Sequence, residues 1–240
     1  MIGSFAALLL LEEMMRKERA SAPNWPRIST NWGLGLVNWT FAAMVPASSI
    51  AAALWSGPGL LAGWHVALAF TALLLVRSFT TYWLHRLFHV WKWLWRIHKV
   101  HHADTVIDCT TALRNHPFEA LATTALAAAT VVLLGPTPVI VAAVEAVLLV
   151  ANFWQHAAIR LPDGLARRTE WLLITPRLHI LHHARTRPDH DSNFGDIVSL
   201  WDRMFGTFNP PRTETVAAGL CDEDAGAHSL PHQLASPFRT

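Results

Sequence analysis

The sequence predicts an all-α, multi-pass membrane helix bundle, and three observations point to this fold class. Apolar residues make up 52% of the chain and charged residues only 15%, against about 25% in soluble domains. Twelve tryptophans stand against one tyrosine, and tryptophan favours membrane–water interfaces. Two long stretches are almost free of charge, and a turn sequence divides each of them. We therefore expect two helical hairpins, about four transmembrane helices, with a cytosolic helical cap.

The first apolar stretch contains no Lys, Arg, Asp or Glu from residue 28 to residue 76. The sequence SGPG at residues 56–59 divides it, because glycine and proline favour turns. The two arms cover about residues 34–55 and 60–81. At 1.5 Å per residue each arm is about 33 Å long, which is enough to cross the ~30 Å hydrocarbon core.

The second stretch, residues 120–159, contains one charged side chain, Glu145. The sequence GPTP at residues 135–138 divides it into arms over about 118–134 and 139–157. An acidic residue inside a membrane helix is a candidate functional residue. An interhelical hydrogen bond explains Glu145 equally well, and the sequence leaves both interpretations open.

Charge sets the expected orientation. None of the 19 Lys and Arg residues lies in either turn sequence, and basic residues favour the cytoplasmic side. We therefore expect residues 82–117 and 158–240 in the cytoplasm, within one domain over residues 1–240 that ends in a loose tail, 219–240. Composition favours a bacterial inner membrane. The sequence does not decide whether residues 2–15 also span it.

Net charge and cysteine content exclude other classes of protein. The formal net charge is only +2, and no basic block is interleaved with aromatic residues, so we expect no nucleic-acid partner. The two cysteines, Cys109 and Cys221, form no CxxC pair. A disulfide framework or thiolate metal site is therefore not expected.

Eight of the 14 histidines fall in three tight groups: HRLFH at 85–89, HKVHH at 98–102 and HILHH at 179–183. Residues three or four apart share a helix face, and imidazole is the commonest protein ligand for metals such as iron and zinc. One such pair is often only a polar surface face, but three groups together predict a metal site. Eight ligands exceed what one metal binds, so we expect two metals. The predicted ligands are His85, His89, His98, His101, His102, His179, His182 and His183.

These motifs resemble the fatty acid hydroxylase/sterol desaturase superfamily of integral-membrane, histidine-rich diiron enzymes, whose pattern is HxxxH, HxxHH and HxxHH. The similarity extends through RNHPFE at 114–119, FWQH at 153–156 and NFG at 193–195, and ends with WDRMFGT at 201–207. It runs in order from about residue 31 to 208. The resemblance implies about four membrane helices and a cytosolic helical domain that holds two metals. The first membrane segment looks short for the family.

The resemblance also implies further site residues. His156, at the end of the last membrane arm, is expected as a ninth ligand. His116 is a tenth candidate, which either serves the site or fills a turn before Pro117. His190 is expected in a solvated loop, with a supporting role at the site as the alternative. Carboxylates commonly hold ligand rings in place, and the candidates near the motifs are Asp104, Asp108, Glu119, Asp191 and Asp196.

Two other features have simpler interpretations. The tryptophans at 91, 93 and 95 alternate with basic residues and are expected to anchor the chain at the membrane interface. Lining a path for lipid is the alternative. Asp202 in the WDR sequence is expected to brace the cytosolic part of the chain rather than contact substrate.

The function that the resemblance implies is oxidation of a membrane lipid. Two iron ions and O₂ would hydroxylate or desaturate a C–H bond, with electrons from a ferredoxin or cytochrome. Zinc can replace iron in a purified sample but has no redox chemistry. The alternatives are a zinc-dependent membrane hydrolase, whose usual HExxH motif is missing from the sequence, and a non-catalytic metal-binding membrane protein. The lipid, the carbon attacked and the oligomeric state do not follow from the sequence.

Overall fold

The computed structural model describes residues 12, 23–44, 48–187, 189–211, 216–220 and 226–239. Within these ranges the regular elements are all helices, and extended pairing is limited to two isolated bridges. The predicted all-α class is therefore confirmed. In chain order the helices are α2 (Trp25–Met44), α3 (Ser49–Trp55), α4 (Val66–Val90), α5 (Lys92–His102), η1 (Cys109–Leu113), α6 (Pro117–Leu134), α7 (Pro138–His156), α8 (Asp163–Thr169), α9 (Pro176–His182), α10 (Leu200–Met204), α11 (Leu230–Ala235) and η3 (Ser236–Phe238).

Three helices, α4, α6 and α7, are long and apolar enough to cross a membrane. Their most apolar 18-residue windows have mean hydropathies of 1.4 to 1.7, yet only 28% of each window is buried within the protein. Leu68, Leu133 and Val139 on these helices are 61%, 65% and 77% exposed. Apolar surface on this scale is rare on soluble proteins. The three helices therefore fit an integral membrane protein.

Two of the expected arms coincide with helices of the structure. The arms expected over 118–134 and 139–157 match α6 and α7 to within one residue at each end. The arm expected over 60–81 begins later, at Val66, where Nδ1 of His65 accepts a hydrogen bond from the N–H of Ala67 at 3.3 Å. This helix, α4, then continues to Val90.

The arm expected over 34–55 is not one helix. It is divided between α2, which ends at Met44, and the seven-residue α3. Ser48 begins α3 by accepting a hydrogen bond at Oγ from the N–H of Ala51 at 3.1 Å. Pro46 stands between the two helices in the sequence, and proline interrupts helices because it lacks an N–H. The described residues thus show three helices that are both long and apolar enough to cross a membrane, where four were expected.

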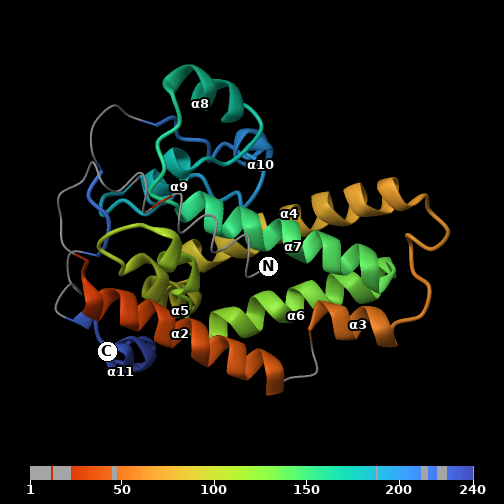
Figure 1. Cartoon of the computed structure of the whole chain (residues 1–240), viewed down its shortest axis with the longest axis horizontal. Coiled ribbons are helices and arrows are strands. Elements are labelled where there is room, and N and C mark those ends of the chain that lie inside the picture. The colour runs from red at the N-terminus through yellow and green to blue at the C-terminus, as the bar shows by residue number, and fades with distance from the viewer. Residues whose placement is uncertain are drawn as a thin grey trace.

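The two turn sequences meet at one end of the bundle (Figure 1). Gly135 ends α6 in the left-handed conformation, with φ of 59°. A Cβ atom on Gly135 would lie 2.0 Å from the backbone nitrogen of Gly59, and one on Gly59 would lie 2.6 Å from the nitrogen of Gly135. Next to this contact, the N–H of Leu61 donates to the carbonyl of Leu134 at 2.8 Å. Two glycines therefore let the hairpin ends pack backbone to backbone.

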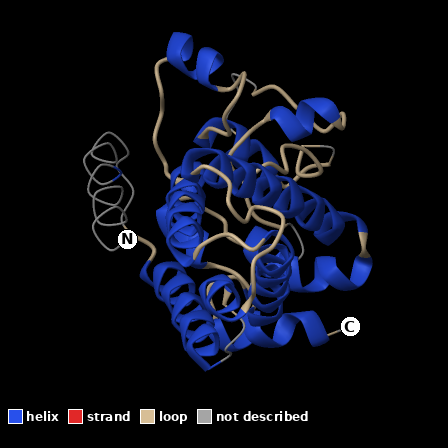
Figure 2. Ribbon diagram, turned by 90° about the vertical axis from the view of Figure 1, so that its right-hand side faces the viewer, coloured by secondary structure: helices blue, strands red, loops and turns tan. Residues whose placement is uncertain are grey.

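The opposite end of the bundle collects most of the short helices, whereas α3 lies near the turns (Figures 1 and 2). The C-terminal part of α4 extends into this end, and α5 begins after a single residue, Trp91. Helices α9 and α10 lie at the same end, and α8 lies beyond them. The described parts of the segments expected to be cytosolic, 82–117 and 158–240, thus gather on one side, away from the two turns.

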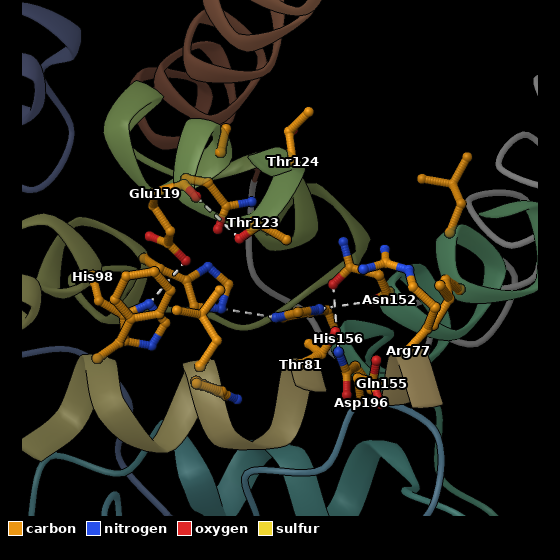
Figure 3. A pocket seen from close by; sticks show the side chains of 18 of the residues that line it. Arg77, Thr81, His98, Glu119, Thr123, Thr124, Asn152, Gln155, His156 and Asp196 are labelled. Carbon is orange, nitrogen blue, oxygen red and sulfur yellow. Dashed lines mark hydrogen bonds and ion pairs between the residues drawn. The ribbon is translucent and has the colours of Figure 1, made fainter. Parts of the chain in front are cut away.

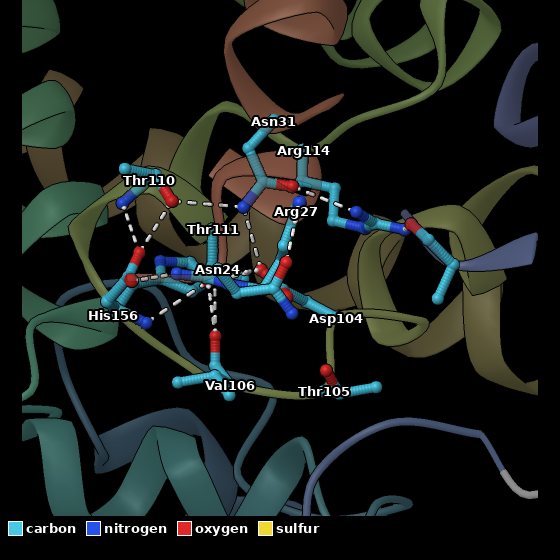
Figure 4. Close-up of polar contacts among 12 residues, drawn as sticks. Asn24, Arg27, Asn31, Asp104, Thr105, Val106, Thr110, Thr111, Arg114 and His156 are labelled. Carbon is cyan, nitrogen blue, oxygen red and sulfur yellow. Dashed lines mark hydrogen bonds and ion pairs between the residues drawn. The ribbon is translucent and has the colours of Figure 1, made fainter. Parts of the chain in front are cut away.

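A buried polar network ties α2 to the segment that follows α5 (Figure 4). Arg27 pairs with Asp104 at 3.0 Å and also with Asp108, and Asn31 donates to Asp104 at 2.9 Å. Burial alone would lower the pKa of Arg27, but the two carboxylates outweigh burial and raise it. Asp104 stands two residues after His102. The network therefore fixes the chain directly beyond the α5 histidines.

The C-terminal segment also differs from its expectation. Residues 219–240 were expected to form a loose tail, but their described part contains α11 and η3. Nη2 of Arg114 donates to the carbonyl of Ala227 at 2.6 Å. Leu230 packs on α2, so closely that a Cβ on Gly33 would lie 2.7 Å from its Cδ2. These contacts hold the segment against the bundle.

We expect Gly135→Ala and Gly59→Ala to lower the unfolding temperature. The first forces a side chain into a left-handed conformation, at a cost of about 1–3 kcal/mol, and both push the two hairpins apart. Gly57→Ala is the matched control, because nothing lies within 4 Å of its added Cβ. Tryptophan fluorescence during heating in detergent measures the three variants, and equal unfolding temperatures would contradict the close contact.

We expect Arg27→Met to destabilise the protein strongly. The substitution leaves two buried carboxylates without their cation, which typically costs about 3–5 kcal/mol. Arg168→Met, at an exposed position of α8, removes the same charge without breaking the network. Thermal unfolding in detergent compares the two, and a variant of Arg27 as stable as that of Arg168 would show that the network contributes little.

Candidate metal centre

The predicted histidine motifs come together at the end of the bundle away from the turns. Helix α4 carries His85 and His89 on its last two turns, and α5 carries its three histidines on its last two turns. Helix α9 and its C-terminal cap carry the third motif, and His156 is the last residue of α7. Segments about 100 residues apart in sequence thus meet in one place.

The histidines form two compact groups. In each group the side-chain nitrogens that could bind a metal all lie within 4.8 Å of one another. Nine of the ten histidines predicted from the sequence belong to them. The first group, here called site 1, is His85, His89, His98, His102 and His182, and the second, site 2, is His101, His156, His179 and His183.

Each HxxHH motif contributes to both sites. In α5, His98 and His102 belong to site 1 and His101 to site 2. In α9 the assignment is reversed: His182 belongs to site 1, and the pair at 179 and 183 to site 2. Residues four apart lie nearly on one helix face, and the residue between them is rotated to the side. The two motifs therefore link the sites.

In site 1, hydrogen bonds fix the outer nitrogen of four of the five rings. Nδ1 of His85 lies 2.9 Å from the carbonyl of Phe194, and Nδ1 of His182 lies 2.8 Å from the carbonyl of Ser192. Since carbonyls only accept, both Nδ1 atoms carry the proton. The Nε2 atoms of both rings then present lone pairs, and both are buried with no partner among the described residues.

Carboxylates hold the outer nitrogen of the other two rings in site 1. Nδ1 of His98 lies 2.9 Å from Oε1 of Glu119, and Nδ1 of His89 lies 3.2 Å from Oδ1 of Asp191. Two of the five carboxylates predicted to support ligands thus contact one. Such partners orient a ligand ring and raise its basicity.

In site 2, ring nitrogens face one another without a proton between them. Nδ1 of His101 donates to the carbonyl of Arg114 at 3.2 Å, and Nδ1 of His156 donates to the carbonyl of Asn152 at 2.7 Å. Their Nε2 atoms nevertheless approach to 3.1 Å. In neutral rings these atoms are both acceptors, so the contact is repulsive unless a cation lies between them. The donor set therefore fits a bound metal ion.

Burial keeps these rings neutral. It lowers the pKa of the α5 and α9 histidines well below the ordinary value, and neighbouring histidines lower it further. A buried imidazolium would lose its hydration and repel the other rings. The neutral imidazole is also the form that binds metals. The six rings for which this holds are His98, His101, His102, His179, His182 and His183.

His116 lies outside both sites. Its Nδ1 accepts a hydrogen bond from the N–H of Phe118 at 3.2 Å and begins α6. Its Nε2 lies 3.3 Å from the carbonyl of Leu234. Of the two roles that the sequence left open, the structure places His116 in the turn.

His190 and Trp95 lie nearer the site than the sequence analysis expected. His190 is only 4% exposed, and its ring stacks on Trp95 with centroids 5.2 Å apart. The Trp95 ring lies 5.1 Å from that of His89, whereas Trp91 and Trp93 are exposed, as expected for interfacial residues. In the sequence, the only indication that His190 is buried is its position between the third histidine motif and the NFG sequence at 193–195.

The remaining predicted carboxylates act at a distance from the rings. Asp104 and Asp108 pair with Arg27, and Asp196 accepts a hydrogen bond from Ser78 Oγ at 2.7 Å. Asp202 accepts from the N–H groups of Phe194 and Gly195 at 2.8 and 3.0 Å, and burial raises its pKa. Asp202 thus braces the loop whose carbonyl holds His85.

A cavity of 380 Å³ leads from the histidines into the membrane helices (Figure 3). Rings of both sites line one part of it, and Leu84, Leu148 and Leu149 provide apolar walls. Arg77 and Glu145 line it as well. The arrangement can bring part of an amphiphile to both histidine groups.

Comparison with known proteins identifies the family to which the chain belongs. Residues 70–207 match the family described as fatty acid hydroxylase, and this range contains every histidine of both sites. The chain is 31% identical over 177 residues to ornithine lipid hydroxylase OlsE of Rhizobium tropici, covering 73% of this chain and 52% of that protein. It is 32% identical over 143 residues to human (Homo sapiens) alkylglycerol monooxygenase, covering 60% and 31%.

A third relative is Delta(7)-sterol 5(6)-desaturase ERG3A of Gibberella zeae, 28% identical over 158 residues, covering 65% of this chain and 41% of that protein. The chain thus matches about half or less of the length of each of these relatives. No solved structure is significantly similar. The family match spans more than half of the chain and the whole histidine cluster, and on that ground the chain belongs to the fatty acid hydroxylase family.

Proposed function

We propose that this protein is an O₂-dependent lipid hydroxylase or desaturase that holds two iron ions in the two histidine sites. The observation that carries the proposal is the convergence of nine imidazoles into two groups. By name, the relatives described above are an ornithine lipid hydroxylase, an alkylglycerol monooxygenase and a sterol desaturase. Membrane-length helices beside the sites supply a route for lipid.

We assign the ligands of each iron according to the two histidine groups in the structure. Site 1 would hold one ion through its five rings, and site 2 would hold the other through its four. His116 is left out because it caps α6. When bound, an iron pair supplies the redox chemistry that activates O₂ toward an unactivated C–H bond, which zinc lacks.

The chain's own residues position the reaction. Glu119, Asp191 and the carbonyls of three loop residues hold the rings in one tautomer. Burial of the rings excludes water, so that reactive species are not lost to solvent. The cavity between α4, α6 and α7 directs a lipid segment toward both sites. Continuous helices make this geometry rigid.

The other partners follow from the reaction. Each turnover consumes electrons, so a donor of ferredoxin or cytochrome type must reach the histidine end of the bundle. Most of the described lysines and arginines lie at that end, and we infer from them that it faces the cytoplasm and attracts an acidic donor. We infer a location in a bacterial inner membrane from the composition of the chain.

We predict that His182→Ala and His183→Ala each remove one of the two irons and abolish lipid oxidation, because each variant damages a different site. The purified protein should fall from about two irons per chain to about one, measured by elemental analysis. His116→Asn keeps a cap for α6 and should keep both irons. Full lipid oxidation in either alanine variant would contradict the metal proposal. Iron loss in the asparagine variant would indicate that His116 is a ligand after all.

We predict that Glu119→Leu weakens iron binding at site 1 by about 10–100-fold, the usual effect of losing a partner that orients a ligand. Nδ1 of His98 loses its acceptor in this variant, whereas Glu119→Gln offers an amide oxygen in the same place and should bind iron more tightly than the leucine variant. Iron retention against a chelator series measures both. Identical retention in wild type and Glu119→Leu would show that the contact does not support the ligand.

A further inference from the structure

The cavity has a charged end inside the membrane helices. Arg77 lies at the middle of α4, and its Nη2 pairs with Oε1 of Glu145 on α7 at 3.2 Å. The Arg77 side chain is 5% exposed. Ionisable groups at this depth are unfavourable in lipid and are usually functional. Both side chains line the cavity that reaches the histidines.

The ion pair leaves other polar atoms along the cavity wall, between Arg77 and His156, without a partner. Nε and Nη1 of Arg77 and Oε1 of Gln155 are buried without a hydrogen-bond partner in the described part of the chain. Asp196 lines the same cavity, and Ser78 holds its Oδ1. Figure 3 shows Arg77, Gln155, Asn152 and Asp196 gathered on one side of the cavity. Burial raises the pKa of Asp196 to about 6.

A structural tie between α4 and α7 does not account for this arrangement. A tie uses one N–H of Arg77 and leaves the others unsatisfied in an apolar bundle, which is unfavourable. Water can satisfy them before substrate binds, but a hydrocarbon chain cannot. The two carboxylates beside one guanidinium also disfavour an anion that brings no donor of its own. The matching occupant offers both an oxygen acceptor and a hydrogen-bond donor.

We propose that the cavity receives the polar headgroup of a lipid, and that Arg77, Glu145 and Asp196 select headgroups that carry both an oxygen acceptor and an amine or amide donor. This inference rests on the proposed function and narrows its substrate class. The acceptor binds Arg77, and the donor faces the carboxylates. The cavity's apolar walls then enclose the carbons that link the headgroup to the histidines.

The position of Arg77 also limits which carbon reacts. Arg77 precedes His85 by eight residues on one continuous helix, which is about 12 Å along the axis. The carbon that reaches the histidines therefore lies within about this distance of the anchored group. Oxidation falls near the headgroup and not at the far end of an alkyl chain.

Binding tests the proposal apart from turnover. The probes are N-palmitoyl-lysine, which offers a carboxylate and an ammonium group, and methyl palmitate, which offers acceptors only. We expect the iron-loaded, detergent-solubilised full chain to bind the first at least about tenfold more tightly, by native mass spectrometry. Equal affinities for the two probes would overturn the proposal.

Variants separate recognition from a structural tie. Arg77→Met/Glu145→Met removes the pair as a unit and leaves no unpaired charge behind. We expect this double variant to unfold near the wild-type temperature and to bind both probes equally, while Arg168→Met on exposed α8 keeps the wild-type preference. A double variant that keeps both its stability and its preference for N-palmitoyl-lysine would show that the pair plays no part in recognition.

Product analysis tests the position of attack. After expression in cells, tandem mass spectrometry locates the added oxygen or double bond relative to the headgroup of each oxidised lipid. A product modified only near the chain terminus would overturn the proposal. If the probe preference is present but no oxidised lipid forms and no O₂ is consumed, the oxidase proposal fails and the recognition site stands.

Discussion

The rest of the structure depends on the burial of imidazoles, six of which have their outer nitrogen held by a carbonyl or a carboxylate. Carbonyls such as those of Phe194 and Arg114 accept the Nδ1 protons, so the inward nitrogens present lone pairs. Lone pairs of several rings confined within 4.8 Å repel one another, and only a positive charge between them makes the interaction attractive. Protonating the rings is unfavourable because they are desolvated and crowded together. A metal ion satisfies all of these groups at once.

Helix geometry explains why this chemistry uses the HxxHH motif twice. Successive residues turn by about 100°, so the fourth residue after the first lies about 40° to one side and the third about 60° to the other. One motif can therefore face two sites, with two rings toward one and the middle ring toward the other. Helices α5 and α9 are arranged in opposite ways: the middle ring of α5, His101, lies in site 2, and the middle ring of α9, His182, lies in site 1. The HxxxH spacing of α4 lacks the middle ring and serves a single site.

The sequence predicts what depends on local pattern and fails where long-range packing decides. The arms at α6 and α7 follow from two apolar runs, with Glu145 as the one charged residue within them, bounded by Gly135 and Pro138, and the ligand motifs follow from spacing. His116 and His156 look alike in sequence, since each stands at one end of a membrane arm. Only packing shows that one begins α6 while the other meets His101. The burial of His190 depends on contacts with Trp95, 95 residues away.

The membrane helices and the histidine sites are parts of one rigid unit, because α4 and α7 extend without interruption from the apolar bundle into the sites. Arg77 and His85 therefore move together, as do Glu145 and His156, which lie on the facing helix. The ion pair between the helices fixes their relative position at one depth, and the rings of both sites fix it at another. In the proposed complex, a lipid bound between these two levels would meet the metal sites at a distance set by backbone geometry. Continuous helices keep such a distance constant better than loops do, and this requirement gives a physical reason for an ion pair between two membrane-length helices despite its unfavourable desolvation.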